Sequence, residues 1–281
     1  MKKLRFIIRS GIGLLLLALF LYWQNNDIVI TKSRYVSSRI PKDFNNFDIA
    51  HISDLHNKSF GKNQSTILNK LNTLSPDIIV ITGDLVDRRK YDLAPAMEFI
   101  EGAIKIAPIY YVSGNHEAWS GEYSTIKESL EDAGVKVLDN SKLGLSRGDS
   151  FIQLLGVRDP AFLTSKDSRF IDKSEIRGEL KKWSLISDFK ILLIHRPELF
   201  DIYAENKMDL IFAGHAHGGQ IRLPIIGGVL APNQGLFPKY TDGSHTKNSS
   251  TMFISRGLGN SIFPFRIGNR PEIVMVTLKT E

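Results

Sequence analysis

The chain has 281 residues, of which 42% are hydrophobic and 23% are charged, proportions typical of a globular protein with one large core. It contains no cysteine, which excludes disulfides, thiolate nucleophiles and cysteine-based zinc sites. The net charge is +6, but four basic residues precede the first acidic one, so the rest is close to neutral and gives little support for a nucleic-acid partner.

A basic and then apolar segment opens the chain. The apolar run from Gly11 to Trp23 is shorter than the ~20 residues of a usual membrane span, but extension back through Ile7 gives a usable length. No small-x-small cleavage site follows, and Tyr22 stands where a membrane interface favours aromatic side chains. We expect an uncleaved signal-anchor in residues 1–24, with a cleaved signal peptide as the alternative.

The flanking charges also predict an orientation. Lys2, Lys3, Arg5 and Arg9 favour a cytoplasmic amino terminus. The catalytic part is then extracytoplasmic in a single-pass membrane protein, or secreted if the segment is cleaved. We expect residues 25–46 to be a juxtamembrane linker and residues 47–281 to be the catalytic domain.

From Phe47 onward, short apolar runs rich in β-formers alternate with helix-length segments, which predicts an α/β domain with buried strands. The expected strands begin at Phe47, Asp77, Pro108, Phe151, Lys190, Asp209, Thr251 and Ile273. The expected helices span 65–74, 94–106, 122–133 and 175–185.

Several predicted strands end in residues that can bind metals or move protons. They are Asp54, His56, Asp84, Asp87, Asn115, His116, Glu117, His195, His215 and His217. Ligand sites in open α/β sheets lie at the carboxyl ends of strands, so we expect these side chains to converge. Asp54 and His56 would point to the same side while the backbone stays extended. Of the remaining histidines, we expect His51 in the core or beside the site, and His245 in a solvated polar loop.

Five motifs together resemble one family. Asp54-x-His56, Gly83-Asp84-x-x-Asp87, Gly114-Asn115-His116-Glu117, His195 and Gly214-His215-Ala-His217 are similar in order and kind to those of the calcineurin-like metallophosphoesterases. The resemblance covers Phe47 to Leu278. It implies a sandwich of two mixed β-sheets flanked by helices, with two divalent metals at the strand ends.

The later motifs resemble a membrane-associated bacterial branch of that family. These are Gly218-Gly219-Gln220, Phe237-Pro-Lys-Tyr240 and Ser255-Arg-Gly-Leu-Gly259. The branch acts on cell-envelope phosphoesters or on nucleotide-linked lipid precursors such as UDP-diacylglucosamine. The resemblance therefore implies a phosphoester substrate that is lipid-linked or part of the envelope.

The family resemblance also implies a role for each site residue. Asp54, His56 and His217 would hold one metal, Asn115, His195 and His215 the other, and Asp84 would bridge both. A hydroxide between two metals ~3.5–4 Å apart would attack the phosphorus. Mixed His, Asp and Asn ligands suit manganese, iron or zinc, with manganese the first choice for activity in vitro.

The residues beside the metal ligands would serve the chemistry. His116 would protonate the leaving oxygen. Asp87 would orient His116, with an acid at a helix start as the alternative, and Glu117 would support the site. The roles of Arg88 and Arg256 stay open; in the protein-phosphatase branch the arginine at the first position contacts phosphate.

The sequence thus predicts hydrolysis of a phosphodiester or pyrophosphate bond. The alternatives are a phosphomonoesterase or nuclease of the same fold, and a metal-binding envelope scaffold without turnover. The oligomeric state is not predicted. The Gly- and Pro-broken stretch 223–237 should begin beside the site, either as a loop that buries Ile225, Ile226, Val229 and Leu230 or as a lip that contacts a membrane or an acyl chain.

Overall fold

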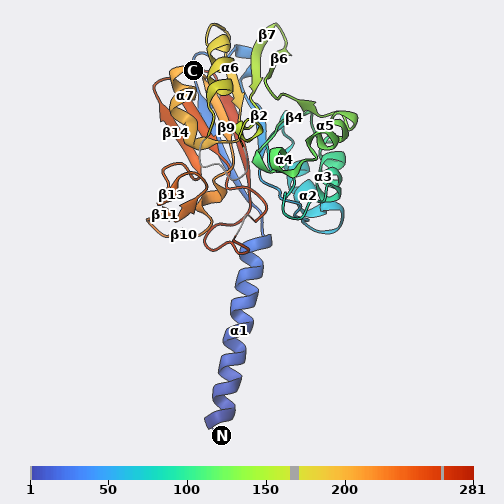
Figure 1. Ribbon diagram of the computed structural model, residues 1–281, viewed down its shortest axis with the longest axis vertical. Helices are drawn as coiled ribbons and strands as arrows, with labels where there is room; N and C mark the ends of the chain where they lie inside the picture. The colour runs from blue at the N-terminus through green and yellow to red at the C-terminus, as the bar shows by residue number, and fades with distance from the viewer. Residues whose placement is uncertain (1, 165–170, 261–262) are drawn as a thin grey trace.

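The computed structural model describes residues 2–164, 171–260 and 263–281. Helix α1 (Lys2–Asn26) projects from the rest of the molecule (Figure 1). It is long and apolar enough to cross a membrane, a test that signal sequences near an amino terminus also pass. Its side chains are exposed except near its carboxyl end, where Gln24 and Asn25 are buried.

The other described residues are built on two six-stranded sheets, each mixing parallel and antiparallel pairs. In spatial order the first contains β1 (Val29–Val36), β16 (Glu272–Lys279), β2 (Phe47–Ile52), β3 (Ile78–Thr82), β4 (Ile109–Val112) and β5 (Lys136–Val137). The second contains β14 (Gly243–Lys247), β15 (Ser250–Ile254), β9 (Leu210–Ala213), β8 (Lys190–Leu193), β7 (Ser150–Gly156) and β6 (Ser141–Arg147).

Apolar clusters join the sheets and helices into four layers. Residues from both sheets share one core, for example Ile49 and Val80 with Ile191 and Phe212, so the sheets pack face to face. The outer face of the first sheet is covered by α2 (Ser65–Leu74), α3 (Ala94–Ala103) and α5 (Tyr123–Asp132). The outer face of the second is covered by α6 (Ser174–Trp183) and α7 (Phe200–Glu205). The predicted sandwich of two mixed sheets flanked by helices is confirmed.

The expected elements agree with the structure wherever apolar runs are long. The eight predicted strands correspond to β2, β3, β4, β7, β8, β9, β15 and β16, and α2 has the predicted bounds. Helix α3 ends at Ala103 rather than Ile106. Helix α4 (Asn115–Ser120) was not predicted.

Three segments differ from their predicted form. Residues 29–36, expected within a linker, form β1 and pair with β16; the domain bounds themselves stay a prediction. His245 lies in strand β14 rather than in a loop, because Gly243–Lys247 pairs with β15. The stretch 223–237 forms two small hairpins rather than a plain loop. Their strands are β10 (Arg222–Leu223), β11 (Gly227–Gly228), β12 (Leu230–Ala231) and β13 (Gly235–Leu236).

The direction of the strands fixes which edge of the first sheet faces α1. Strand β1, which follows α1, runs parallel to β16, and β16 runs antiparallel to β2. The carboxyl end of β2 therefore lies beside the start of β1, at the end of the domain that α1 enters (Figure 1). Strands β3 and β4 run parallel to β2, so their carboxyl ends lie at the same edge.

Candidate metal centre

The site begins in the turn after β2. This strand ends at Ile52, and Asp54 and His56 have φ angles of 54° and 49°, in the left-handed region. The expectation of an extended backbone is therefore wrong here, yet the turn directs both side chains into the protein, where they are buried. Residues other than glycine adopt such angles uncommonly, and strained positions of this kind tend to cluster at functional sites.

A second tight turn follows β3. Gly83 has a φ of 86°, and a Cβ there would collide with the backbone of Gly114, so only glycine fits. The buried Glu117 carboxylate accepts N–H groups of Asp84 at 2.8 Å, Val86 at 3.2 Å and Gly114 at 2.8 Å. Burial and the nearby Asp84 charge raise the pKa of Glu117 to about 7, against these hydrogen bonds. Glu117 thus ties the turns after β3 and β4 together, the supporting role expected of it.

One cluster of donor atoms contains residues from the first and the last of the five sequence motifs. The donor atoms of Asp54, His56, Asp84 and His217 all lie within 4.8 Å of one another and are buried. The Nε2 atom of His217 is 3.1 Å from Asp54 Oδ1 and 3.1 Å from His56 Nε2. Two ring nitrogens facing one carboxylate oxygen form a typical cation site.

A second cluster contains Asp84, His195 and His215, again within 4.8 Å. The Nδ1 atom of His195 lies 2.6 Å from the Thr82 carbonyl oxygen, which can only accept, so Nδ1 carries the proton. Its Nε2 then faces Asp84 Oδ2 at 3.2 Å. His215 similarly donates Nε2–H to Asn233 Oδ1 at 3.0 Å, which leaves its Nδ1 for the site.

Asp84 and Asn115 complete the arrangement. Asp84 Oδ1 accepts the His116 backbone N–H at 2.8 Å, while Oδ2 lies 3.2 Å from His195 Nε2 and 3.6 Å from His56 Nε2. One oxygen therefore faces both clusters. Asn115 Oδ1 is buried and has no hydrogen-bond partner among the described residues. A buried oxygen without a donor fits a cation ligand, and the chain's residues suit two divalent ions.

The pocket keeps the rings of His215 and His217 neutral and favours positive charge on His195. Burial lowers the pKa of His217 to about 3, despite Asp54, and lowers that of His215 well below its usual range. Burial would also lower the pKa of His195, but the Asp84 carboxylate outweighs it and raises the value to about 10. The carboxylates therefore attract a cationic charge into a water-poor site.

A family model describing calcineurin-like phosphoesterases matches residues 47–219, more than half of the chain and the whole run from Asp54 to His217. The chain belongs to this family. As a metallophosphoesterase it is a hydrolase that acts on phosphoester bonds.

Three relatives place this phosphoesterase among bacterial and animal proteins. It is 29% identical to the Bacillus subtilis protein named uncharacterized metallophosphoesterase YkuE, over 92% of this chain and 88% of that one. It is 26% identical to the phosphodiesterase YaeI of Escherichia coli, over 72% of this chain and 70% of that one. It is also 26% identical to a transmembrane protein with metallophosphoesterase domain of Danio rerio, over 86% and 55% of the two chains.

A cavity of about 110 Å³ opens over both clusters of the phosphoesterase. Its lining residues include Asp84, Arg88, Asn115, His116, Trp119 and Asn233. The Arg88 guanidinium lies over the Trp119 ring, 4.9 Å from its centre. Asp84 and His215 of one cluster, and His217 of the other, thus line a cavity that a substrate group can enter.

His116 is held at the wall of this cavity. Its Nδ1 accepts the Arg88 backbone N–H at 3.2 Å and lies 3.5 Å from Asp87 Oδ1, so Nε2 is the nitrogen free to meet a substrate. Asp87 also pairs closely with Arg89, at 2.6 Å. Burial would raise the pKa of Asp87, but the adjacent His116 ring and hydrogen bonds from Arg89 outweigh it and lower the pKa well below its usual range. Asp87 lies in a loop before α3, not at a helix start.

The other residues singled out in the sequence lie outside the clusters. His51 is buried in β2, with Nε2 2.8 Å from Thr82 Oγ1, as a core residue next to the site. Arg256 pairs with Glu272 at 2.9 Å and is largely buried, which is a structural contact.

Three residues near the site carried no recognisable signal in the sequence. The Arg196 guanidinium pairs with the fully buried Asp159 through two contacts of 2.7 and 3.0 Å. Arg196 also donates to Asn233 Oδ1 at 2.9 Å, the same oxygen that accepts from His215. Asp159, Arg196 and Asn233 thus hold His215 in place. Asn233 comes from the hairpin segment, far from any motif, and only its contact in space identifies it.

Proposed function

We propose that this phosphoesterase is anchored in a membrane by α1 and hydrolyses a phosphodiester or pyrophosphate bond in lipid-linked or cell-envelope material. The observation that supports this most is the direction of the site. The carboxyl ends of β2, β3 and β4 face the end of the domain that α1 enters. A phosphoester carried at the surface of that membrane can then reach the site without any reorientation of the domain.

In this proposal, two divalent cations occupy the two clusters, with manganese, iron and zinc all compatible with the ligands. Asp54, His56 and His217 would hold one ion, Asn115, His195 and His215 would hold the other, and Asp84 would contribute to both. When bound, such a pair lowers the pKa of water and neutralises charge on the phosphate. The neutral Asn115 oxygen limits the negative charge that the second ion must balance.

His116 is the residue that handles the proton. In the neutral ring, Nδ1 accepts from Arg88 N–H, so Nε2 carries the proton and is the nitrogen that meets the substrate. The acid is the imidazolium form, which gives Nε2–H to the leaving oxygen and becomes a neutral ring that keeps the proton on Nδ1. When Nδ1 is also protonated, the Asp87 carboxylate is near enough to stabilise the charge. Asp87 is therefore a positioning residue, and Arg88, at the cavity wall over Trp119, supplies positive charge for a phosphate oxygen.

The side of the membrane follows from the charges that flank α1. Lys2, Lys3, Arg5 and Arg9 precede the apolar part of α1, which keeps the amino terminus cytoplasmic and the domain extracytoplasmic. A membrane-impermeant maleimide tests this on Leu185→Cys, since the chain has no cysteine of its own. Labelling in intact cells is expected, and labelling only after lysis would contradict the orientation.

The reaction itself is tested with the full-length protein in vesicles and three substrate types. We expect bis-p-nitrophenyl phosphate and a diacyl nucleotide pyrophosphate to be cleaved much faster than p-nitrophenyl phosphate. A preference for p-nitrophenyl phosphate would indicate a phosphomonoesterase instead. Bound metal without turnover on any substrate would indicate a scaffold.

A further inference from the structure

Large apolar side chains are exposed at one end of the domain. They come from the two hairpins and from the loop that precedes β16, and we call them the apolar rim: Leu223, Ile225, Ile226, Leu230, Leu236, Phe237, Phe263 and Phe265. Of the four residues that a folded-back loop would have buried, Val229 is half-buried and the other three are exposed. The rim is therefore not part of the core.

Ile225 shows that the rim does not serve the fold. It is fully exposed at the tip of the first hairpin and has a φ of 72°. A β-branched residue in the left-handed region is strained. A fully exposed isoleucine also contributes no hydrophobic free energy to folding. Both features are unfavourable in the isolated domain. They become favourable only where another surface buries the Ile225 side chain.

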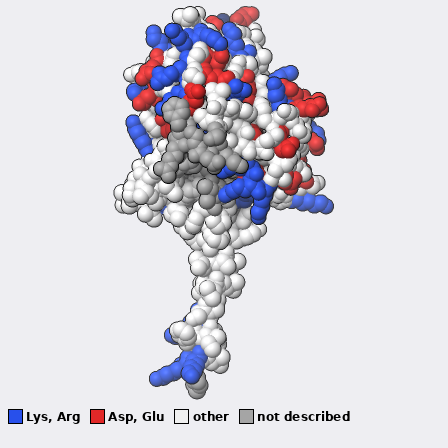
Figure 2. Space-filling view, in the orientation of Figure 1, with Lys and Arg blue, Asp and Glu red and all other residues white. Residues whose placement is uncertain are grey.

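Hydrogen bonds connect the rim to the end of α1. Strand β10 is held to the loop before β16 by Arg222 N–H, which donates to the Ile267 carbonyl at 2.9 Å. The neighbouring Arg266 N–H donates to Asn25 Oδ1 of α1 at 3.0 Å. Figure 1 places the hairpins at the end of the domain that α1 enters. On the face shown in Figure 2, the surface where the projecting helix joins the domain is mostly uncharged, with a group of basic side chains just above it.

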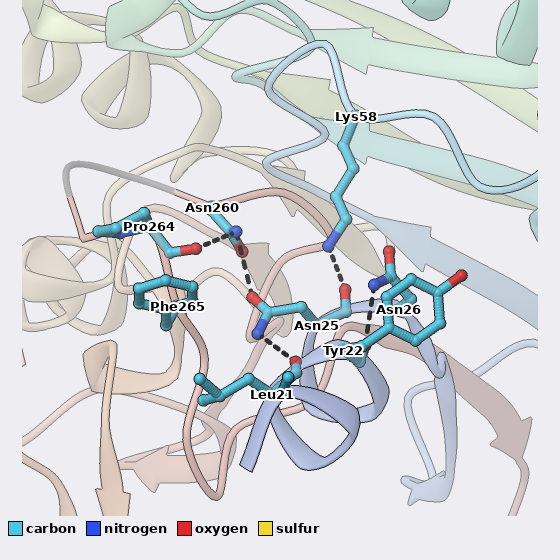
Figure 3. A pocket seen from close by; sticks show the side chains of 9 residues that line it. Leu21, Tyr22, Asn25, Asn26, Lys58, Asn260, Pro264 and Phe265 are labelled. Atoms are coloured by element: carbon cyan, nitrogen blue, oxygen red, sulfur yellow. Dashed lines mark hydrogen bonds between the residues drawn. The ribbon is translucent and has the colours of Figure 1, made fainter. Parts of the chain in front are cut away.

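The junction between α1 and the domain is fixed rather than hinged (Figure 3). Asn25 Oδ1 also accepts from Asn260 Nδ2 at 3.1 Å, and the Asn25 carbonyl accepts from Lys58 Nζ. One residue beyond α1, Asp27 pairs with Arg270 at 2.7 Å. Because the helix end is held on several sides, the direction of α1 determines which face of the domain meets the membrane.

We propose that the apolar rim docks onto the lipid bilayer and seats the domain with its metal centre toward the membrane surface. This inference rests on the proposed anchoring by α1. The occupant is the bilayer because the rim adjoins α1, whose exposed apolar side chains continue away from the domain at the same end. Tyr22 and Trp23 lie at the end of α1 next to the domain, and such aromatic residues are enriched at the membrane–water interface. The membrane surface is therefore placed at the junction between α1 and the domain. An uncharged, apolar surface at that depth is stabilised by contact with acyl chains.

The absence of cysteine from the chain allows a direct test. Single cysteines at Ile225 and Phe237 are labelled with the fluorophore NBD in the full-length protein, reconstituted in phosphatidylcholine–phosphatidylglycerol vesicles with and without nitroxide lipids. Leu185→Cys is the matched control, since Leu185 is 88% exposed and precedes the amino end of β8, away from the site. Leu15→Cys, in the middle of α1, reports on anchoring alone.

We expect the labels at 225 and 237 to shift to the blue and to be quenched by nitroxide lipids, while the label at 185 behaves as in water. Aqueous emission at 225 and 237 with a quenched label at 15 would overturn docking and leave anchoring intact. A blue shift without quenching would also overturn it, because protein rather than lipid would then cover the rim. An aqueous label at 15 would refute both docking and the proposed anchoring.

Discussion

Asp84 divides its two oxygens between the protein and the two proposed cation sites. Oδ1 accepts the His116 N–H, whereas Oδ2 faces His56 and His195. We expect Asp84→Ala to abolish hydrolysis and to remove most bound transition metal, because no other carboxylate belongs to both clusters in the described part of the chain. Metal content is measured by mass spectrometry on purified protein. Two ions still bound per chain would contradict the bridging role.

His116 is predicted to act on the proton rather than on the metals. Its ring contacts Arg88 N–H and Asp87, and its side chain belongs to neither donor cluster. We expect His116→Ala to keep its metal and to lose roughly two to four orders of magnitude in turnover, the scale of general acid catalysis. The loss should shrink for p-nitrophenol leaving groups, which need little protonation. A variant that cleaves an alkyl diester at the wild-type rate would refute the role.

Asn233 provides a test of how His215 is held. Its Oδ1 accepts from both His215 and Arg196, so its loss frees the imidazole to rotate. We expect Asn233→Ala to weaken metal affinity about 10–100-fold, the usual effect of removing a residue that orients a ligand. Chelator competition measures the affinity. Asn233→Asp, which keeps an oxygen acceptor, should recover most of it, and equal affinities in wild type and Asn233→Ala would show that Asn233 does not orient the ligand.

At the scale of elements, the two hairpins are expected to matter for lipid substrates alone. Ile226 and Leu230 are exposed, and burying such a side chain is worth about 1.5–3 kcal/mol. Replacing both by serine should lower the rate on a vesicle-borne lipid-linked substrate about tenfold or more. Hydrolysis of bis-p-nitrophenyl phosphate and the melting temperature should hardly change.

The serine replacement of Leu185 is the control for the hairpin variant, because it removes a still more exposed apolar side chain away from the site. It should affect neither substrate. An equal loss on both substrates by the hairpin variant, with a lower melting temperature, would mean that Ile226 and Leu230 contribute to the core.

The elements that could be predicted from the sequence are those that bury apolar residues on both faces. Ile78–Thr82 and Leu210–Ala213 are wholly buried strands, and their almost entirely apolar composition predicts them. Strand β1 has a single buried residue, Tyr35, and contains four charged or hydroxyl residues in a row, Thr31 to Arg34, so only its pairing with β16 identifies it. Two-residue strands such as β10 have no pattern to detect.

The site divides in the same way. Histidines and carboxylates that follow strand ends could be predicted to lie together, because the carboxyl ends of parallel strands meet at one edge of a sheet. The contacts of Arg196 and Asn233 depend on how a hairpin segment folds back over the sheet, which no local spacing encodes. The left-handed turns at Asp54 and His56 were missed for a related reason: their strain is held by the surrounding packing rather than by local preference.

For the whole molecule, metal binding should contribute to stability. The clusters join turns from both sheets, so a bound ion links the two halves of the sandwich. At a free metal concentration 100 times the Kd, the stabilisation is about 2.7 kcal/mol, and the melting temperature should rise roughly 5–10 °C. Calorimetry on chelator-treated and manganese-loaded protein measures the shift. Asp84→Ala should show little of it, and an unchanged melting temperature in the wild type would argue against tight binding.

The position of β16 between β1 and β2 also sets an order of events during synthesis. Strand β1 emerges from the ribosome directly after α1, but its ladder partner is residues 272–279, so it waits unpaired for most of translation. Three of the residues that hold the end of α1 and the residue after it, Asn260, Arg266 and Arg270, are equally late. Such distant pairings form slowly, because a long loop must close first. If α1 anchors the protein as proposed, a chain released early inserts its helix but does not orient its domain, so the proposed seating at the membrane requires the finished chain.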